Sequence, residues 1–76
     1  MTVTDAEWGQ AIEAVNAAQK IGVVGHVRPD GDALGSIIAV ALGARSVGKD
    51  AVASFGLPFV VGDEFRVLDQ RVLVHP

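Results

Sequence analysis

The chain of 76 residues contains no cysteine, which excludes disulfides, thiolate zinc sites and thiol nucleophiles. Basic residues are few: six Lys and Arg stand against nine Asp and Glu, and the formal net charge is −3. They form no cluster, so the chain lacks the electrostatic footprint of a protein that binds duplex nucleic acid. Composition therefore excludes disulfides, thiolate zinc sites, thiol nucleophiles and duplex nucleic-acid binding before any motif is considered.

Long apolar runs are missing as well. The longest extends over 37–42, whereas a helix that spans a bilayer needs roughly 20 apolar residues. The N-terminus carries Asp5 and Glu7 and has no apolar segment of the kind found in signal peptides. Hydrophobic residues make up 50% of the chain, enough for a globular core. We therefore expect a cytoplasmic protein with no membrane contact.

Helical and strand patterns alternate along the chain. Thr4 and Glu7 have the spacing of a capping box, and apolar residues at helical intervals predict a helix over 5–19. A β-branched run between glycines predicts a buried strand over 21–25. A second helix is expected to begin near Asp32 or Ala33 and to end near Gly48, a good residue to follow a helix.

Three further elements are expected: a strand over 50–55, a short helix over about 64–70 and a strand over 71–75. The order α-β-α-β-α-β predicts an α/β fold with a parallel sheet, right-handed crossovers and flanking helices. The second helix is apolar around nearly its full circumference, which predicts burial on more than one side. Because a small parallel sheet needs cover on both faces, we expect 1–76 to be the N-terminal part of a larger domain.

Residues 26–36, His-Val-Arg-Pro-Asp-Gly-Asp-Ala-Leu-Gly-Ser, carry the clearest chemical signal. They follow a predicted strand and open a predicted helix, where α/β folds place their ligand sites. One imidazole, His26, and two carboxylates, Asp30 and Asp32, are a suitable ligand set for a divalent cation. Such mixed ligands favour manganese, zinc or iron over calcium, and magnesium tolerates the carboxylates.

The same residues also have a structural interpretation. Asp32 is a good N-cap, Asp30 can complement the helix dipole, and His26 can hydrogen-bond a loop carbonyl. Pro29 is expected to stiffen the loop and to push Arg28 toward an extended conformation. Spacing alone leaves the metal-binding and the structural interpretation open.

Other ligand-binding motifs do not fit the loop. A calcium-binding loop counted from Asp30 would need oxygen ligands at its fifth and twelfth positions, where the chain has Leu34 and Ala41. No Gly-Lys-Ser/Thr sequence indicates a P-loop, and the glycines lack dinucleotide-binding spacing. Ser36 lacks the Gly-x-Ser-x-Gly context of a nucleophile elbow.

The string His26-x-x-Pro29-Asp30-x-Asp32-Ala33-x-Gly35-Ser36 closely resembles the first motif of the DHH phosphoesterase superfamily. This superfamily includes RecJ-like exonucleases, oligoribonucleases with pAp-phosphatase activity, cyclic-dinucleotide phosphodiesterases and inorganic pyrophosphatases. The resemblance covers about 7–76, and the oligoribonuclease/pAp-phosphatase branch is the best match. It implies that 1–76 form the N-terminal portion of a DHH domain.

On this resemblance His26, Asp30 and Asp32 match metal ligands, usually of two manganese ions, and the string supplies no catalytic residue beyond them. Gly35 matches a position that permits close packing of helix on sheet, and Ser36 one that supports a ligand or binds backbone. The family's second-motif Asp, its Asp-His-His motif and its C-terminal substrate domain have no counterpart in 1–76. Asp63 and Asp69 do not follow an apolar strand, and His75 is expected to be structural or at the surface.

The resemblance implies a metal-dependent phosphoesterase that hydrolyses short single-stranded oligonucleotides or nucleotide phosphates such as pAp. Three ligands cannot build two metal sites, so we expect the 76 residues alone to be inactive and to bind a metal weakly or not at all. Two alternatives remain. One is a non-catalytic interaction module that forms a homo-oligomer through its apolar second helix. The other is a nucleotide-binding domain that holds phosphates with Mg²⁺ without cleaving them.

Overall fold

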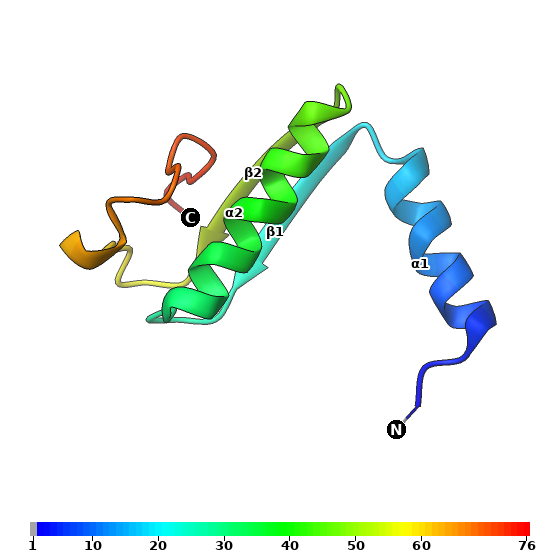
Figure 1. Cartoon of the computed structure of the whole chain (residues 1–76), viewed down its shortest axis with the longest axis horizontal. Coiled ribbons are helices and arrows are strands. Elements are labelled where there is room, and N and C mark those ends of the chain that lie inside the picture. The colour runs from blue at the N-terminus through cyan, green and yellow to red at the C-terminus, as the bar shows by residue number, and fades with distance from the viewer. Residues whose placement is uncertain (1) are drawn as a thin grey trace.

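A computed structural model describes residues 2–76 of the chain. In sequence order it contains α1 (Asp5–Ala17), β1 (Lys20–Gly25), α2 (Gly31–Ser46), β2 (Asp50–Phe55) and a 3₁₀ turn, η1 (Asp63–Phe65). Figure 1 shows α2 lying along both strands, while α1 extends away from them and the C-terminal segment lies on the other side. The predicted α/β class is therefore confirmed for the described residues.

The two strands form a parallel sheet that is joined through α2. Their register runs from Lys20 opposite Asp50 to Gly25 opposite Phe55. Parallel strands need such a crossover because the end of one strand and the start of the next lie at opposite edges of the sheet. The predicted strand over 50–55 has the bounds of β2, and the bounds of α1, β1 and α2 differ from prediction by at most two residues at either end.

The core lies on one face of this sheet. It comprises eight buried side chains, from α2, from β2 and from the segment after η1: Leu34, Ile37, Ile38, Ala41, Ala51, Ala53, Phe55 and Val72. The other side of α2 is open, with Val40 55% exposed. The prediction that this helix is buried on more than one side is therefore wrong for the described residues, because nothing in 2–76 covers its outer side.

The two ends of α2 follow its sequence signals with one correction. Asp30 is the N-cap, with its Oδ1 accepting from the Ala33 backbone N–H at 2.8 Å, whereas Asp32 lies in the first turn. The sequence predicts Asp32 as the cap and Asp30 as the partner of the helix dipole, and the structure exchanges these two roles. Gly48 follows the helix with a φ of +86°, the left-handed conformation that glycine adopts without strain.

The C-terminal third departs most from prediction. In place of the helix expected over 64–70 there is only η1, which begins after Gly62. The strand expected over 71–75 is reduced to one parallel bridge between Ala53 and Leu73. Four backbone hydrogen bonds between residues three apart turn the chain between Gly62 and Leu73, and a backbone that turns in this way cannot pair continuously with a strand. The structure therefore has two strands and two α-helices among the described residues.

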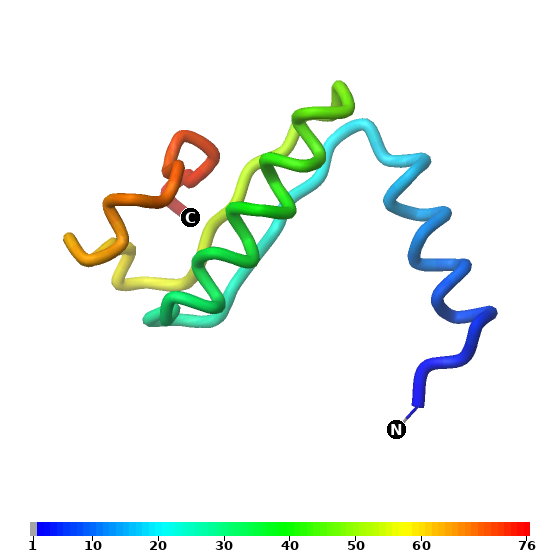
Figure 2. Tube along the Cα trace, in the orientation of Figure 1, coloured from blue at the N-terminus to red at the C-terminus, as the bar shows by residue number. Residues whose placement is uncertain are grey.

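Helix α1 stands apart from this layered unit, as the tube in Figure 2 makes plain. Its capping box is present: the Thr4 hydroxyl accepts from the Glu7 N–H at 3.1 Å, and Glu7 Oε1 accepts from the Thr4 N–H at 3.0 Å. No residue of α1 is buried by the described chain. Neither α1 nor α2 has the length and apolar character needed to cross a bilayer, and no other described helix does.

Candidate functional site

The loop that carries the motif connects the C-terminal end of β1 to the N-terminus of α2. Gly25 is the last residue of β1, His26 follows it directly, and α2 begins at Gly31. The structure therefore places the loop at the strand end where ligand sites of α/β proteins occur. It also places the N–H groups of the first helical turn beside the loop, and these favour anionic groups.

One carboxylate oxygen of Asp30 is already engaged in a structural hydrogen bond. Its Oδ1 caps α2 through Ala33, which leaves Oδ2 as the oxygen available to a ligand. Asp32, two residues on, is exposed in the first helical turn. Both carboxylates therefore lie where the positive end of the helix dipole stabilises negative charge.

The His26 ring is oriented by its neighbour. His26 Nδ1 lies 2.8 Å from the carbonyl oxygen of Val27, as the structural interpretation anticipated. A carbonyl partner requires that Nδ1 carry a proton, and in the neutral ring Nε2 is then the nitrogen with a free lone pair. The same bond is the usual second contact of a metal-ligating histidine, so it is compatible with both interpretations.

The three residues do not converge into a finished site. Within 2–76, no group of three His, Asp or Glu side chains is arranged so that it could hold a metal ion. His26, Asp30 and Asp32 share one end of the sheet, yet they do not by themselves fit a divalent cation in this conformation. The arrangement offers separate oxygen and nitrogen donors at one strand end, and no complete ligand cage.

The loop backbone departs from expectation at Arg28. Its φ is +50°, in the left-handed region, so the predicted extended conformation is wrong. The loop must reverse direction between β1 and α2 within five residues, and a positive φ achieves this at a cost of roughly 1–2 kcal/mol for a residue with a Cβ. The strain lies between His26 and Asp30 and so sets their relative orientation.

Gly56 supports the loop from the end of β2 and was not singled out from the sequence. A Cβ built on Gly56 would lie 2.5 Å from Val27 Cγ1, closer than real side chains approach. A side chain at position 56 would therefore require the Val27 side chain to shift. The signal that could have identified it is its position: Gly56 follows β2 as His26 follows β1, at the same edge of a parallel sheet.

Gly35 and Ser36, the last two residues of the motif, say less about a ligand site. A Cβ built on Gly35 would meet nothing within 4 Å, so the expectation that Gly35 permits close helix–sheet packing is wrong. The core side of α2 is instead formed by Leu34, Ile37 and Ile38, which flank it. Ser36 is exposed on α2, one turn beyond Asp32.

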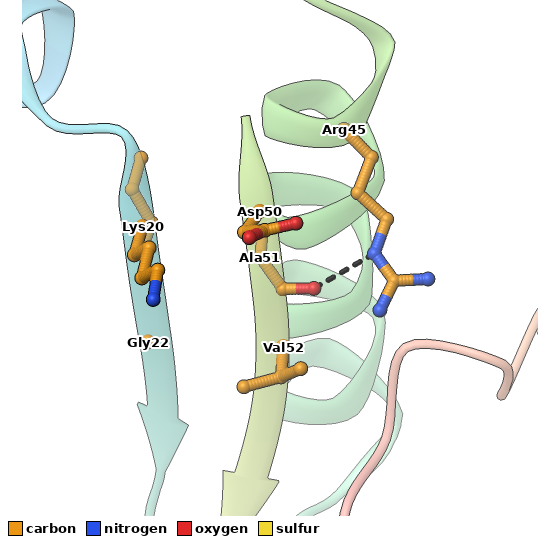
Figure 3. Close-up of a pocket in the computed structure, with 7 residues that line it drawn as sticks. Lys20, Gly22, Arg45, Asp50, Ala51 and Val52 are labelled. Atoms are coloured by element: carbon orange, nitrogen blue, oxygen red, sulfur yellow. Dashed lines mark hydrogen bonds between the residues drawn. The ribbon is translucent and has the colours of Figure 1, made fainter. Parts of the chain in front are cut away.

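A cavity of about 410 Å³ lies at the other end of the sheet, lined by the first three residues of each strand together with Arg45. Figure 3 shows Arg45 reaching from α2 toward β2, where its Nε donates to the Ala51 carbonyl at 2.7 Å. Lys20 and Asp50 stand at the strand starts beside it. This cavity is separate from the motif loop, because the loop follows the strand ends.

The strongest electrostatic perturbation is also remote from the loop. Hydrogen bonds from Arg71 lower the pKa of the Asp69 carboxyl to about 2, and Asp69 in turn raises the pKa of Arg71. His75 stacks at a tilt on Phe59, with ring centroids 5.2 Å apart, in keeping with the structural role expected of it. Asp69 and His75 therefore have local partners in the C-terminal segment.

No family model matches this chain, and no solved structure matches it.

Proposed function

We propose that residues 26–36 contribute part of the divalent-metal site of a DHH-type phosphoesterase. The substrate class is short oligonucleotides or nucleotide phosphates such as pAp, and the metal is manganese. The observation that carries the proposal is the position of the motif, which runs from the end of a parallel strand into the N-terminus of α2. The resemblance of the motif to the first DHH motif supplies the chemistry.

Three features of the loop support this assignment. The bond from Nδ1 to Val27 directs His26 Nε2 away from the backbone, and Asp30 keeps one oxygen uncommitted. Asp32 is exposed beside them. These are donors of the kinds that manganese accepts. They are also incomplete, so the proposal assigns a partial ligand set that needs further ligands to bind metal tightly.

The same proposal includes the complete order of helices and strands that the sequence predicts. An α-β-α-β-α-β order, as the N-terminal portion of a larger DHH domain, requires the segment after η1 to pair with β2 as a third strand. The bridge between Ala53 and Leu73, with the Val74 N–H donating to the Ala53 carbonyl at 2.9 Å, supports this pairing. A further parallel strand beside β2 would extend the sheet in that direction.

The test on this chain uses paramagnetic Mn²⁺ as the probe. Titration at millimolar concentration is expected to broaden the amide resonances of 26–33 selectively, because a partial ligand set binds weakly. Asp32→Asn and Asp30→Asn remove the carboxylates, and asparagine still caps a helix, so the fold is retained while the broadening is lost. Asp63→Asn is the matched control and leaves the broadening unchanged. Broadening spread evenly over all acidic residues would contradict the proposal.

The test of activity applies to the larger protein that the resemblance implies. Asp30→Asn and Asp32→Asn are each expected to abolish manganese-dependent hydrolysis of pAp or of a short oligonucleotide, whereas the 76 residues alone show no appreciable turnover. Retention of turnover in both variants would refute the assignment of these residues as metal ligands.

A non-catalytic module is the second candidate. It is favoured by the capping bond of Asp30 and the Val27 bond of His26, because both side chains already have structural roles. On this hypothesis Mn²⁺ broadens no loop resonance selectively, and Asp30→Asn changes nothing but stability. The manganese titration therefore separates the two candidates.

A further inference from the structure

Two apolar surfaces of this chain are uncovered. The first, the α1 stripe, consists of Trp8, Ala11, Ile12 and Val15, which share one face of the helix and line a shallow hollow of about 250 Å³. The three larger side chains are each 55–58% exposed. The second is the sheet face opposite α2. This open sheet face carries Val24, which is 79% exposed, and Val52, which lies opposite Gly22.

The chain exposes more surface than a compact monomer of its size. Its accessible area is 5485 Å², and its mass is 7.9 kDa. The size scaling of folded monomers gives about 4,400 Å² for that mass, so the excess is about 1,100 Å². A standard protein interface buries about 800 Å² on each partner. The radius of gyration is 13.6 Å, against about 11 Å for a compact chain of this length. The excess is therefore large enough for one stable dimer contact.

The structure holds α1 away from its own sheet. Lys49 Nζ, from the turn between α2 and β2, donates to the carbonyl oxygens of Asn16 at 3.0 Å and Ala18 at 2.5 Å. These bonds fix the last turn of α1 beyond the strand starts (Figure 1). Only Ala18 and Gln19 connect α1 to β1. Docking of α1 on a second copy leaves both bonds of Lys49 intact.

Charge favours a contact between α1 and the sheet over a contact between two α1 helices. Helix α1 contains Asp5, Glu7 and Glu13 and no basic residue. Two such helices repel each other. On the open sheet face the strand starts carry Lys20 and Asp50, one charge of each sign. An acidic helix is therefore repelled less by this face than by a second α1, and Lys20 offers it a cation that α1 lacks.

We propose that two copies of this chain form a reciprocal dimer in which the α1 stripe of each copy packs on the open sheet face of the other. Each copy gives one helix and receives one, so the interface is isologous and the dimer is closed. Trp8 is the central anchor, since buried Trp side chains contribute most to interfaces. This assembly uses neither α2 nor the motif loop.

The first test uses the single tryptophan as a reporter. Trp8 emission is expected to shift to the blue as concentration rises, in step with dimer formation in sedimentation equilibrium. Ile12→Glu on α1 and Val24→Glu on the open sheet face each raise the dissociation constant at least tenfold. Val40→Glu, on the outer side of α2, is the matched control: Val40 is 55% exposed and Ile12 is 56% exposed, but Val40 lies outside the interface.

The second test identifies which surfaces contact each other. Because the chain contains no cysteine, an introduced cysteine is the only thiol that can form a disulfide. Ile12→Cys chains mixed with Val24→Cys chains are expected to give disulfide-linked heterodimers under mild oxidation. Neither variant forms such links by itself, because the reciprocal contact brings position 12 of one copy to position 24 of the other. A mixture of Ile12→Cys with Val40→Cys remains unlinked.

Each other outcome overturns the proposal. A monomer at all concentrations, with red-shifted Trp8 emission, shows that the two surfaces do not meet. A concentration-independent blue shift, with an internal disulfide in a chain carrying both Ile12→Cys and Val24→Cys, shows that α1 closes on its own sheet. Linkage of Ile12→Cys chains alone shows pairing of two α1 helices. A dimer that Val40→Glu abolishes lies on α2.

Discussion

Helices α1 and α2 have similar N-terminal caps but differ in how much of their surface is buried. Each has an N-cap whose side-chain oxygen accepts from the helix backbone, and each has apolar residues at helical spacing. Four side chains of α2 are buried against the sheet, whereas α1 buries none within the described chain. The difference shows that caps and periodicity set where a helix begins, and that a packing surface decides how much it contributes to stability.

Length does not account for the difference. Helix α1 has 13 residues and α2 has 16. Isolated helices of about 12–15 residues are marginal in water, so α1 depends on its capping box and on whatever covers its stripe. Helix α2 is held by burial of Leu34, Ile37 and Ile38, which removes about 1.5–3 kcal/mol of unfavourable hydration for each side chain. We therefore expect α1 to open locally and α2 to open only with the whole fold.

The largest expected difference in the free energy of unfolding is between substitutions of two isoleucines. Ile38 is 3% exposed and Ile12 is 56% exposed. Ile38→Ala is expected to lower the free energy of unfolding by about 2–5 kcal/mol, because it removes transfer energy and leaves a cavity. Ile12→Ala should change it by less than about 0.5 kcal/mol, as for other surface positions. Urea unfolding below the concentration of Trp8-reported association provides the measurement.

A chain of this size has roughly 4–11 kcal/mol of stability, so Ile38→Ala can prevent folding altogether. Ile38→Val, expected to cost about 0.5–1.5 kcal/mol, then keeps the comparison measurable. Equal effects at positions 12 and 38 would show that α1 is packed in the monomer, contrary to the contrast drawn between the two helices.

The two caps provide a smaller and sharper contrast. Asp30→Ala removes the oxygen that accepts from Ala33 and should lower the global free energy of unfolding by about 1 kcal/mol. Thr4→Ala removes the hydroxyl that accepts from Glu7, at a similar local cost, yet it should melt only α1. Native-state hydrogen exchange distinguishes them: Asp30→Ala lowers protection in α2 and both strands, and Thr4→Ala in α1 alone. Loss of strand protection in Thr4→Ala would contradict this assignment.

Local signals in the sequence predicted most element boundaries. The capping box of Thr4 and Glu7 and the turn at Gly48 depend on residues a few positions apart, so their geometry follows from sequence. The choice between two aspartates for the second cap did not follow. Asp30 is the cap because its backbone is extended, with φ −80° and ψ −177°, while Gly31 already begins the helix. Either residue type suits the position, and only the path of the loop selects one.

Long-range features were predicted less well, because they depend on tertiary packing that residue spacing does not specify. The position of the motif loop at the end of β1 followed from the strand pattern, but the left-handed Arg28 and the close approach of Val27 to Gly56 depend on how the loop packs against β2. The predicted third strand is present only as the Ala53–Leu73 bridge, because pairing beyond that bridge depends on what else borders the sheet. Convergence of donors into a metal site is also a tertiary property, which residue spacing cannot specify.

The smallest expected effect is a pH dependence confined to α1. Hydrogen bonds from the Thr4 backbone and hydroxyl lower the pKa of the Glu7 carboxyl below its ordinary value of 4.5. The capping contribution of ionised Glu7 is therefore complete above pH 4.5 and is lost as the pH falls through the lower value in the helix. In dilute solution, ¹³Cα shifts of α1 should move toward coil values over that window. Glu7→Gln retains the capping box without titrating and should show no such change. An equal change in Glu7→Gln would assign the acid sensitivity to another group and remove Glu7 as the pH-dependent support of α1.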